Sequence, residues 1–395
     1  MPKRKVETGE VKAKKRKVHQ DEEEATVDTS KPSAVFQPSG GRSWTLSVAL
    51  PGSVVANAKS HEQKTFLAGQ IARALAVFCV DEIVIFDDED TPTQQRRPEI
   101  AETDYTAFSH PDHFLAHLLS YLETPPHLRR ALFPMHPNLR TAGTLPSLDM
   151  PHHLRANELC EYREGVTVRA APAGPGNGTL VDVGLSNHVT VSDDIPPGTR
   201  VTVHLQEQSS TAAAETVAPN VPREEKGYYW GYSVRQCSSL SDIWTECPFK
   251  GGYDVSIGTS ERGKPLGKVL SRSPFRDSSL LGFKHVLLVF GGVAGLEKAA
   301  KNDVNLYEHG IGEKNVKELF DAWVNVLPGQ GSRTIRTEEA IWLGLMGLRP
   351  FVEQLGKPAP VPLPPSDGPE SESESDQSSS SDGRFSPVKI RGIWA

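Results

Sequence analysis

Apolar strands and amphipathic helices alternate along two separate stretches of this chain, and this alternation constrains the fold more than any other feature. Residues 44–49 read as a strand, and a helix begins after Ser60, with Gln63 at the position of a capping box. The apolar residues 82–86 then predict a second, buried strand. A strand, a helix and another strand in succession are typical of a parallel α/β sheet.

A second amphipathic helix is expected around residues 114–122, and the pattern then changes near Met150. From about residue 154 to 244 the chain is rich in β-branched residues, glycine and turn sequences such as AGPGNG and DDIPPG. Short strands are predicted at 166–168, 180–183, 188–191 and 200–205. Several short strands in one stretch favour a small β-barrel of the OB type, which we place at residues 151–245.

The α/β pattern returns after this stretch. An apolar strand is expected at 285–290, a helix from 296, a further helix at 313–323, a strand at 323–327 and a last helix capped by Thr337. The barrel is therefore expected to interrupt one α/β domain, whose two parts span residues 43–150 and 246–356.

Both ends of the chain are polar, which predicts disordered tails over residues 1–42 and 357–395. The basic clusters PKRKV and KAKKRKV look like signals that a nuclear import receptor reads, so we expect a nuclear or nucleolar protein. The alternative is a basic arm that contacts RNA phosphates. The segment SESESDQSSSSDG is either a phosphorylation target or a solubilising tail.

The composition argues against several classes of protein. Four cysteines are scattered without a CxxC pair, so neither a disulfide framework nor a zinc ribbon is expected. No apolar run approaches the ~18–20 residues that span a bilayer, and we expect a soluble intracellular protein without a membrane partner. The formal net charge of -7 argues against a uniformly basic surface that coats nucleic acid.

Two strand-to-loop junctions carry the chemistry. The sequence HVLLVFGGVAGLE (285–297) places Gly291 and Gly292 directly after a buried strand, where glycine lets a ligand approach the backbone closely. It is neither the GxGxxG fingerprint of dinucleotide-binding proteins nor a phosphate-binding P-loop. The second junction, NVLPGQGSRTIRTEEA (325–340), is more specific.

Residues 328–340 resemble the C-terminal signature of the SPOUT, or trefoil-knot, superfamily of methyltransferases. Within them, RTIRTEEA (333–340) is similar to the RILRTETA motif of one group of rRNA uridine methyltransferases. VSIGTSERG (255–263) and LPSLDMPHHL (145–154) resemble a eukaryotic and archaeal branch with an OB-like insert, including a subfamily related to a human centromere- and spindle-associated protein. The likeness covers about residues 43–355.

The resemblance implies an α/β domain with a parallel sheet, whose C-terminal helix passes through a loop so that the chain is knotted. It also implies a homodimer with RNA at the interface, and a bent S-adenosyl-L-methionine held largely by backbone groups of the knot loops. On this chain the matching positions are Gly291, Gly292, His309, Gly310, Gly312, Asn325, Val326, Leu327, Pro328, Gly329, Gln330, Gly331, Ser332 and Thr337.

Methyl transfer from a sulfonium needs few catalytic groups, because the sulfonium is already a strong electrophile. If the target is N3 of uridine, its deprotonation leaves negative charge on the neighbouring carbonyl oxygens, which arginine or N–H donors stabilise. The candidate catalytic residues are Arg262, Arg333 and Arg336, with Glu261 as proton acceptor. For each arginine the alternative is to bind an RNA phosphate or to pair with the glutamates at 338–339.

Tyr229 and Trp230 are candidates for stacking on RNA bases beside Arg235. The alternative is that these aromatic side chains fill the wall of the barrel. His110, His113 and His117 lie at helical spacing, but neither an HExxH motif nor a carboxylate triad accompanies them, so no metal is expected.

The sequence therefore favours an S-adenosylmethionine-dependent RNA methyltransferase that acts on N3 of a uridine in rRNA. The alternative is an RNA-binding or spindle- and centromere-associated scaffold that keeps the fold without turnover. The glycine-rich loop at 328–332 favours the enzyme, because a scaffold has no need of cofactor contacts.

Overall fold

The computed structural model of the protein describes residues 38, 40–101, 103–170, 178–206, 214–272 and 284–355. Apart from residues 38 and 40–42, the tails predicted at 1–42 and 357–395 lie outside these residues. Within the described ranges, no helix has both the length and the apolar character that a membrane span requires.

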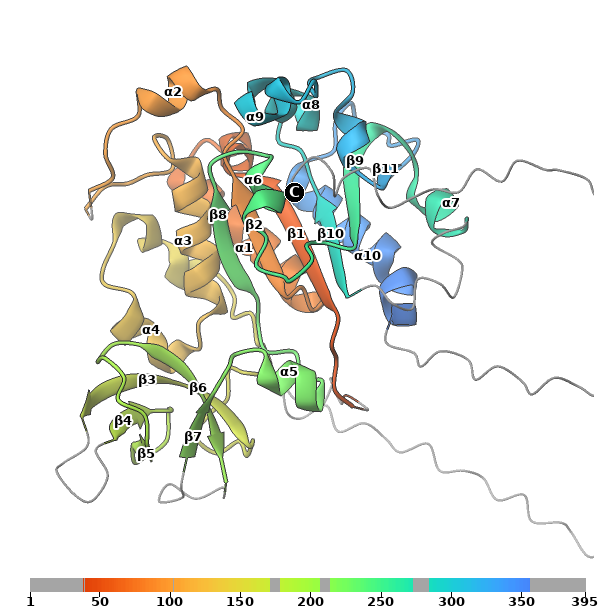
Figure 1. Ribbon diagram of the computed structural model, residues 1–395. Coiled ribbons are helices and arrows are strands. Elements are labelled where there is room, and N and C mark those ends of the chain that lie inside the picture. Colours follow the sequence, from red (N-terminus) through yellow and green to blue (C-terminus); the bar gives the residue numbers. More distant parts are fainter. Residues whose placement is uncertain are drawn as a thin grey trace, which may run out of the picture.

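A six-stranded, fully parallel sheet forms the centre of the described chain, in the order β11-β9-β10-β1-β2-β8 (Figure 1). Its strands are β1 (Thr45–Pro51), β2 (Glu82–Phe86), β8 (Ser233–Cys237), β9 (Val255–Pro265), β10 (His285–Val289) and β11 (Ala322–Asn325). The strands predicted at 44–49, 82–86 and 285–290 are confirmed.

Helices cover both faces of this sheet. Successive strand residues point to opposite faces, so the fully buried neighbours Val48 and Ala49 of β1 belong to two different cores. One core packs against α1 (His61–Val77), α3 (Pro111–Glu123), α7 (Leu266–Leu270) and α10 (Thr337–Leu355). The other packs against α6 (Asp242–Thr245), α8 (Gly295–Asn302), α9 (Val304–Glu308) and the 3-10 helix η6 (Val316–Leu319).

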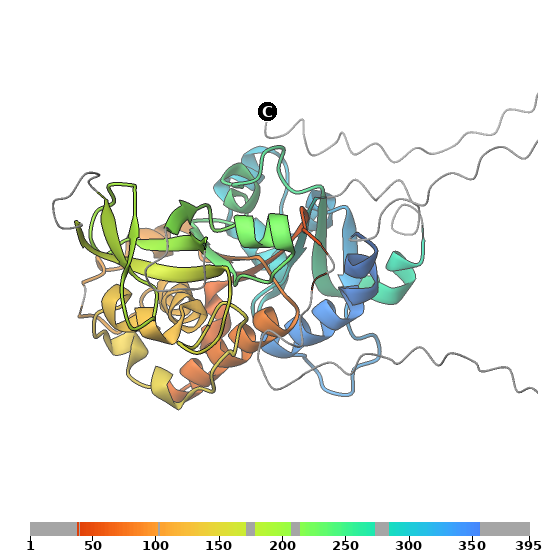
Figure 2. The ribbon, with the colours of Figure 1, turned by 90° about the horizontal axis from the view of Figure 1, so that it is seen from below.

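Helices α1 and α10 lie side by side along one side of the molecule (Figure 2). Phe78 at the end of α1 and Trp342 of α10 meet edge to face, with ring centroids 5.6 Å apart. The remaining helices are short: α2 (Thr91–Gln95), α4 (Pro126–Leu132), α5 (Val221–Lys226), η2 (Gly52–Asn57), η3 (Pro137–Leu139) and η4 (Ala142–Thr144). They connect the larger elements.

Of two predictions made from local sequence signals, one is confirmed and one is wrong. The capping box is confirmed, because the Ser60 hydroxyl accepts from the amide of Gln63 and the Gln63 side chain accepts from the amide of Ser60. The helix predicted at 313–323 is wrong, since only η6 forms there before β11 begins. The side chain of Asn315 bonds instead to the amide of Gly312 and the carbonyl of Gly310, and such local bonds compete with a helix.

An antiparallel five-stranded sheet forms from the segment between α4 and α5, in the order β5-β4-β3-β6-β7. Its strands are β3 (Tyr162–Ala170), β4 (Thr179–Asp182), β5 (Val189–Val191), β6 (Arg200–Leu205) and β7 (Ala214–Val217). The edge strands β5 and β7 approach each other, and the Thr216 hydroxyl donates to the Asp193 carboxylate, so the sheet is nearly closed. In Figure 1 this sheet (lower left) lies at the opposite end of the molecule from α8 and α9.

The boundary predicted at residue 245 for this unit is too late. Strand β8 returns to the parallel sheet and pairs with β2, from Ser233 opposite Glu82 to Cys237 opposite Phe86. This edge strand carries polar residues, which is why its sequence does not read as part of a buried sheet. Its Arg235 pairs with the buried Glu82 of β2 at 3.1 Å.

A buried charged cluster joins the antiparallel sheet to α3. Arg200 of β6 contacts Glu123 at the end of α3 and Glu164 of β3, each at 2.6 Å. His152 lies 2.8 Å from Glu123, and the Trp230 indole donates to Glu164 at 2.7 Å. Burial by itself raises the pKa of Glu123, but the Arg200 guanidinium and the His152 hydrogen bond outweigh it and lower that pKa to about 2.

We predict that Arg200→Ala lowers the free energy of unfolding by about 3 kcal/mol, because it leaves two buried carboxylates without their cation. The pKa of Glu123 lies below its ordinary value of 4.5, so its contribution to stability is present above pH 4.5 and is lost as the pH falls toward 2. Urea unfolding at several pH values measures both effects, and the variant should show a weaker dependence on acid.

The control is Arg349→Ala, which removes an exposed pair between Arg349 and Glu353 of α10. It should change the free energy of unfolding by less than about 0.5 kcal/mol. Equal losses in the two variants would contradict a role for the buried cluster in holding the two units together.

Candidate active site

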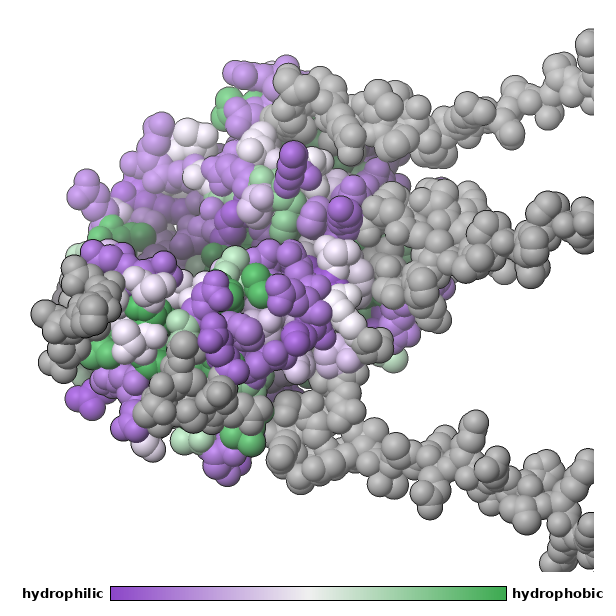
Figure 3. All heavy atoms as spheres, turned by 60° about the horizontal axis from the view of Figure 1, so that its bottom comes forward, coloured by the Kyte–Doolittle hydropathy of each residue, from purple (hydrophilic) through white to green (hydrophobic). Residues whose placement is uncertain are grey.

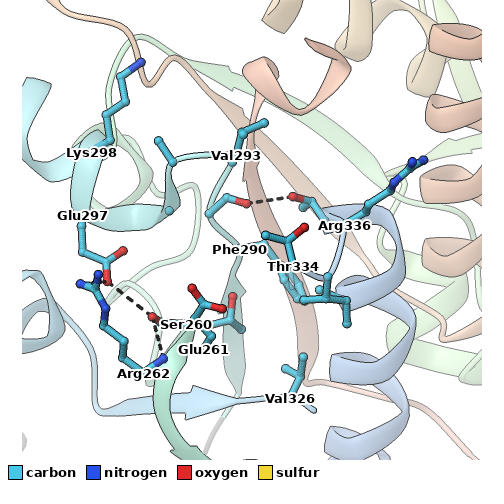
Figure 4. Close-up of a pocket in the computed structure, with 18 of the residues that line it drawn as sticks. Ser260, Glu261, Arg262, Phe290, Val293, Glu297, Lys298, Val326, Thr334 and Arg336 are labelled. Carbon is cyan, nitrogen blue, oxygen red and sulfur yellow. Dashed lines mark hydrogen bonds and ion pairs between the residues drawn. The ribbon is translucent and has the colours of Figure 1, made fainter. Parts of the chain in front are cut away.

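A cavity of about 510 Å³ opens between strand β9, the loops after β10 and β11, and the start of α10 (Figure 4). These three strands are neighbours in a parallel sheet, so their carboxyl ends lie at one edge, where α/β proteins bind ligands. The cavity is lined by Asn57, Thr259, Ser260, Glu261, Arg262, Phe290, Gly291, Gly292, Val293, Ala294, Gly295, Glu297, Lys298, Lys301, Glu313, Asn325, Val326, Gln330, Thr334, Ile335, Arg336, Thr337 and Ala340.

The turn after β10 passes close to a buried carboxylate. A Cβ atom at Gly292 would lie 2.6 Å from the Ser53 hydroxyl and 3.2 Å from the Asp88 carboxylate, so only glycine fits there without displacing them. Ser53 donates to Asp88 at 2.7 Å. Asp88 is only 4% exposed, and its burial raises the pKa of its carboxyl group. The hydrogen-bonded side chains of Ser53 and Asp88 therefore pack against the backbone of this turn.

Strand β9 bulges into the cavity. Gly258 pairs with Trp323 of β11, and the next pair joins Lys264 to Val324, so residues 259–263 are left out of the ladder. Glycine is required at both ends of this bulge. A Cβ atom at Gly258 would lie 2.7 Å from the rings of Phe320 and Trp323, and one at Gly263 would lie 2.2 Å from the carbonyl carbon of Val324.

Side chains from the neighbouring strands hold the bulge in place. The Thr259 hydroxyl donates to the Val289 carbonyl at the end of β10, at 3.0 Å. The Asn325 amide donates to the Glu261 carbonyl at 2.8 Å, and its oxygen accepts from the amide of Leu327 at 2.9 Å. Asn325 therefore ties the tip of the bulge to the loop that leads into α10.

Cations gather around the cavity mouth. Arg262 and Arg336 are 78% and 65% exposed at their side chains, and each has a carboxylate within 4 Å: Glu297 at 3.5 Å and Glu338 at 3.9 Å. Lys298 and Lys301 line the same cavity from α8. The carboxylates of Glu261, Glu297 and Glu313 line the same cavity, so its rim carries charges of both signs.

A family model described as "Putative RNA methyltransferase" matches residues 45–348, a span that runs from β1 into α10. The chain belongs to this family. A human protein named 28S rRNA (uridine-N(3))-methyltransferase is 45% identical over 342 residues, which cover 85% of this chain and 86% of that protein.

This chain is also similar to proteins of the same name from two other animals. The Mus musculus protein is 46% identical over 324 residues, covering 81% of this chain and 80% of that protein. The Drosophila melanogaster protein is 44% identical over 313 residues, covering 77% of this chain and 62% of that protein. The predicted membership of a SPOUT RNA methyltransferase family is therefore confirmed, and with it the prediction of an RNA methyltransferase.

The structure brings part of the predicted site together in this methyltransferase. The residues around the cavity that the sequence singled out are Glu261, Arg262, Gly291, Gly292, Asn325, Val326, Gln330, Arg336 and Thr337. The predicted residues that do not line it are His309, Gly310, Gly312, Leu327, Pro328, Gly329, Gly331, Ser332 and Arg333, although Glu313 and Thr334 beside them do.

Local bonds explain why the second group lies elsewhere. The Gln330 amide donates to the carbonyls of Ser332 and Arg333, and the Ser332 hydroxyl donates to the Thr334 carbonyl, so this exposed loop is folded on itself. At the end of α9, the His309 ring forms a hydrogen bond with the Asn305 carbonyl, and Ile311 is buried in the second core.

Thr337 has a different role from the predicted helix cap. It is the first residue of α10, and its hydroxyl donates to the Gly291 carbonyl at 3.0 Å. Arg336 takes the cap position instead, because the amides of Glu339 and Ala340 both donate to its carbonyl and the Glu339 side chain accepts from its amide. Thr337 thus joins two walls of the cavity.

The predicted RNA contacts at Tyr229, Trp230 and Arg235 are not available for base stacking. Tyr229 is 2% exposed and donates to the Val80 carbonyl, and Trp230 is 8% exposed and donates to Glu164. Arg235 donates to Glu82 and to the carbonyl of Ile243 and the hydroxyl of Tyr253. Tyr229 packs in the core beneath α1 and α3. It therefore has a structural role, as in the alternative interpretation, but in the core of the parallel sheet instead of the barrel wall.

The sequence analysis missed several residues around the cavity, and one signal could have found three of them. Glu297, Lys298 and Lys301 follow the glycine turn at the spacing that places side chains on one face of a helix. Ser260 and Phe290 carry no such signal, because the bulge and the end of β10 are set by strand pairing.

We predict that Thr337→Val lowers the free energy of unfolding by about 1 kcal/mol, since a shape-matched apolar group leaves the Gly291 carbonyl without its donor. Thr337→Ser keeps the hydroxyl and should cost less than about 0.5 kcal/mol. Chemical denaturation of both variants measures the difference, and equal stability of Val and Ser variants would contradict the contact.

Proposed function

We propose that this methyltransferase transfers a methyl group from S-adenosylmethionine to N3 of a uridine in ribosomal RNA. The observation that carries the proposal is the bulge at 259–263, which presents Glu261 and Arg262 at a cavity whose opposite wall is the glycine turn after β10. The names of the similar animal proteins support uridine N3 in 28S rRNA as the target.

The cavity fits a cofactor of this size and chemistry. Its volume of about 510 Å³ lies within the range of small-molecule sites. Gly291 and Gly292 line it with backbone that carries no side chain, and Phe290, Val326 and Ile335 provide apolar surface for an adenine ring. Glu313 offers a carboxylate to hydroxyl and ammonium groups. S-adenosylmethionine supplies an electrophilic methyl group when bound there.

The residues of the bulge handle the charge and the proton of the uracil. N3 of uracil carries a proton that must leave as the bond between N3 and the methyl carbon forms, and we assign Glu261 as its acceptor. Negative charge then develops on the two carbonyl oxygens beside N3. We assign the guanidinium of Arg262, which lines the cavity from the same bulge, to the stabilisation of that charge. Arg336 lies across the cavity and suits a phosphate of the RNA.

RNA is expected at the cavity rim rather than on the antiparallel sheet. Two arginines of that sheet are already engaged: Arg200 by Glu123 and Glu164, and Arg163 by the carbonyls of Glu158 and Val183. Figure 3 shows hydrophilic and hydrophobic patches mixed on this side of the molecule. Among the described residues, none of the exposed large hydrophobic side chains is an aromatic residue of this sheet, so the sheet presents no platform for stacking bases. We propose that this sheet is an OB-like insert that serves mainly as a structural unit.

The knot of the SPOUT superfamily is also part of the proposal. The chain leaves the edge strand β11, returns toward the middle of the sheet and packs α10 against β10, where Gly344 leaves room for Phe290. The bond between Thr337 and Gly291 then ties the start of α10 to the turn after β10. This path supports a helix threaded through the loops that form the cavity.

Two further proposals concern assembly and location. Val77 of α1 and Leu343 and Met346 of α10 are 41%, 37% and 64% exposed on two helices that pack together, and we propose that this apolar surface joins two copies in a homodimer. We also propose a nuclear location, directed by the basic clusters near the N-terminus, which lie outside the described residues.

We predict that purified protein converts uridine to 3-methyluridine in an rRNA transcript supplied with S-adenosylmethionine, detected by nucleoside mass spectrometry. S-adenosylhomocysteine at 100 times its Kd should stabilise the fold by about 2.7 kcal/mol. Arg262→Ala should keep this stabilisation and lose turnover. Stabilisation without product from any rRNA would contradict the substrate, and no stabilisation at all would favour a scaffold without turnover.

We predict that the double variant Leu343→Glu/Met346→Glu lowers the mass measured by light scattering from two chains to one, because paired carboxylates cannot be buried in the contact. Substitution of Phe66, an exposed apolar residue elsewhere on α1, by Glu is the matched control and should leave two chains. A dimer that persists in the double variant would place the interface on another surface.

A further inference from the structure

We propose that Glu297 of α8 is a positioning residue that holds Arg262 and the Ser260 hydroxyl over the cavity. The inference rests on the proposed methyl transfer to uridine, because it concerns the residue that sets Arg262 in place. Glu297 contacts the bulge at two points through the same oxygen. Its Oε1 lies 3.5 Å from Arg262 Nη1 and accepts from the Ser260 hydroxyl at 3.5 Å (Figure 4).

The need for such a residue follows from the exposure of Arg262. Its side chain is 78% exposed, and a long, solvated arginine side chain visits many rotamers unless a partner restrains it. The backbone amide of Arg262 donates to the Ser260 hydroxyl at 3.2 Å. This bond fixes the backbone of Arg262 but does not restrain its guanidinium. Glu297 is the carboxylate that the structure pairs with its guanidinium.

Glu297 itself is held on a rigid element. Its side chain is only 16% exposed, and its helix neighbours Leu296, Ala299 and Ala300 are buried in the second core. The turn before it leaves space for the carboxylate, because Gly295 has a φ of 76° and a Cβ atom there would lie 2.5 Å from Glu297 Oε2. The carboxylate is therefore fixed at the N-terminal end of α8, beside the bulge.

This arrangement separates two roles around one cavity. In this proposal Arg262 stabilises the charge on the reacting base, while Glu297 acts on the reaction only through Arg262 and the bulge. A residue of this kind should affect the rate of methyl transfer more than the binding of cofactor or RNA. It should also lose its effect once the arginine is gone, since the two side chains then no longer work as a pair.

The test is a double-mutant cycle on rRNA methylation by the full chain. Arg262→Ala should lower kcat about 100-fold and Glu297→Ala about tenfold, while the RNA KM and the Kd for S-adenosylhomocysteine change less than about twofold. The double variant should match Arg262→Ala. Glu297→Gln keeps the shape of the side chain and an acceptor for Ser260 but removes the charge, so its kcat should be close to that of Glu297→Ala. Because this variant is nearly isosteric, it also controls for a folding defect in Glu297→Ala.

A second pair serves as the matched control. Lys226 and Glu161 form an ion pair at 3.1 Å beside the antiparallel sheet, and alanine at either position should leave kcat unchanged. The inference is overturned if the effects of Glu297→Ala and Arg262→Ala multiply, if Glu297→Gln retains wild-type kcat, or if Glu297→Ala mainly weakens S-adenosylhomocysteine binding. A wild-type protein that forms no 3-methyluridine would overturn the proposed function as well, which separates the two failures.

Discussion

The parallel pairing of β9, β10 and β11 is the constraint on which the rest of this structure depends. Hydrogen bonds between neighbouring parallel strands bring three carboxyl ends to one edge of the sheet, although the strands lie far apart in the sequence. The bulge within β9, the glycine turn after β10 and the segment that leads from β11 into α10 meet at this edge. None of these segments forms a binding site alone, and the cavity exists only because strand pairing brings all three together.

The bulge in β9 shows how such a site is built at the expense of regular structure. Residues 259–263 lose their backbone pairing with β11. Two side-chain hydrogen bonds partly replace it, from Thr259 to the Val289 carbonyl and from Asn325 to the Glu261 carbonyl. Bulges re-aim side chains and occur often beside active sites. Here the result is that Glu261 and Arg262 lie at the cavity instead of alternating across the sheet.

Charge is distributed in two contrasting ways over the molecule. At the cavity rim, Arg262 and Arg336 are exposed and their ion pairs are long. Arg336 can exchange Glu338 for an RNA phosphate, while the role proposed for Glu297 is to restrain Arg262 beside the bulge. At the junction of the antiparallel sheet with α3, Arg200 is enclosed by two carboxylates at 2.6 Å. The first arrangement suits recognition and catalysis, and the second suits a fixed joint between two units.

The sequence by itself determined the family and those elements that carry a strong local signal. Apolar runs marked β1, β2 and β10, the capping box marked the start of α1, and the motifs at 255–263 and 328–340 identified the methyltransferase, because each of these signals is local. Only the tertiary structure decided which residues meet. Strand pairing placed β8 in the parallel sheet, packing buried Tyr229 and Trp230, and the bulge brought Ser260 to Glu297, since contacts between distant segments leave no periodic trace in the chain.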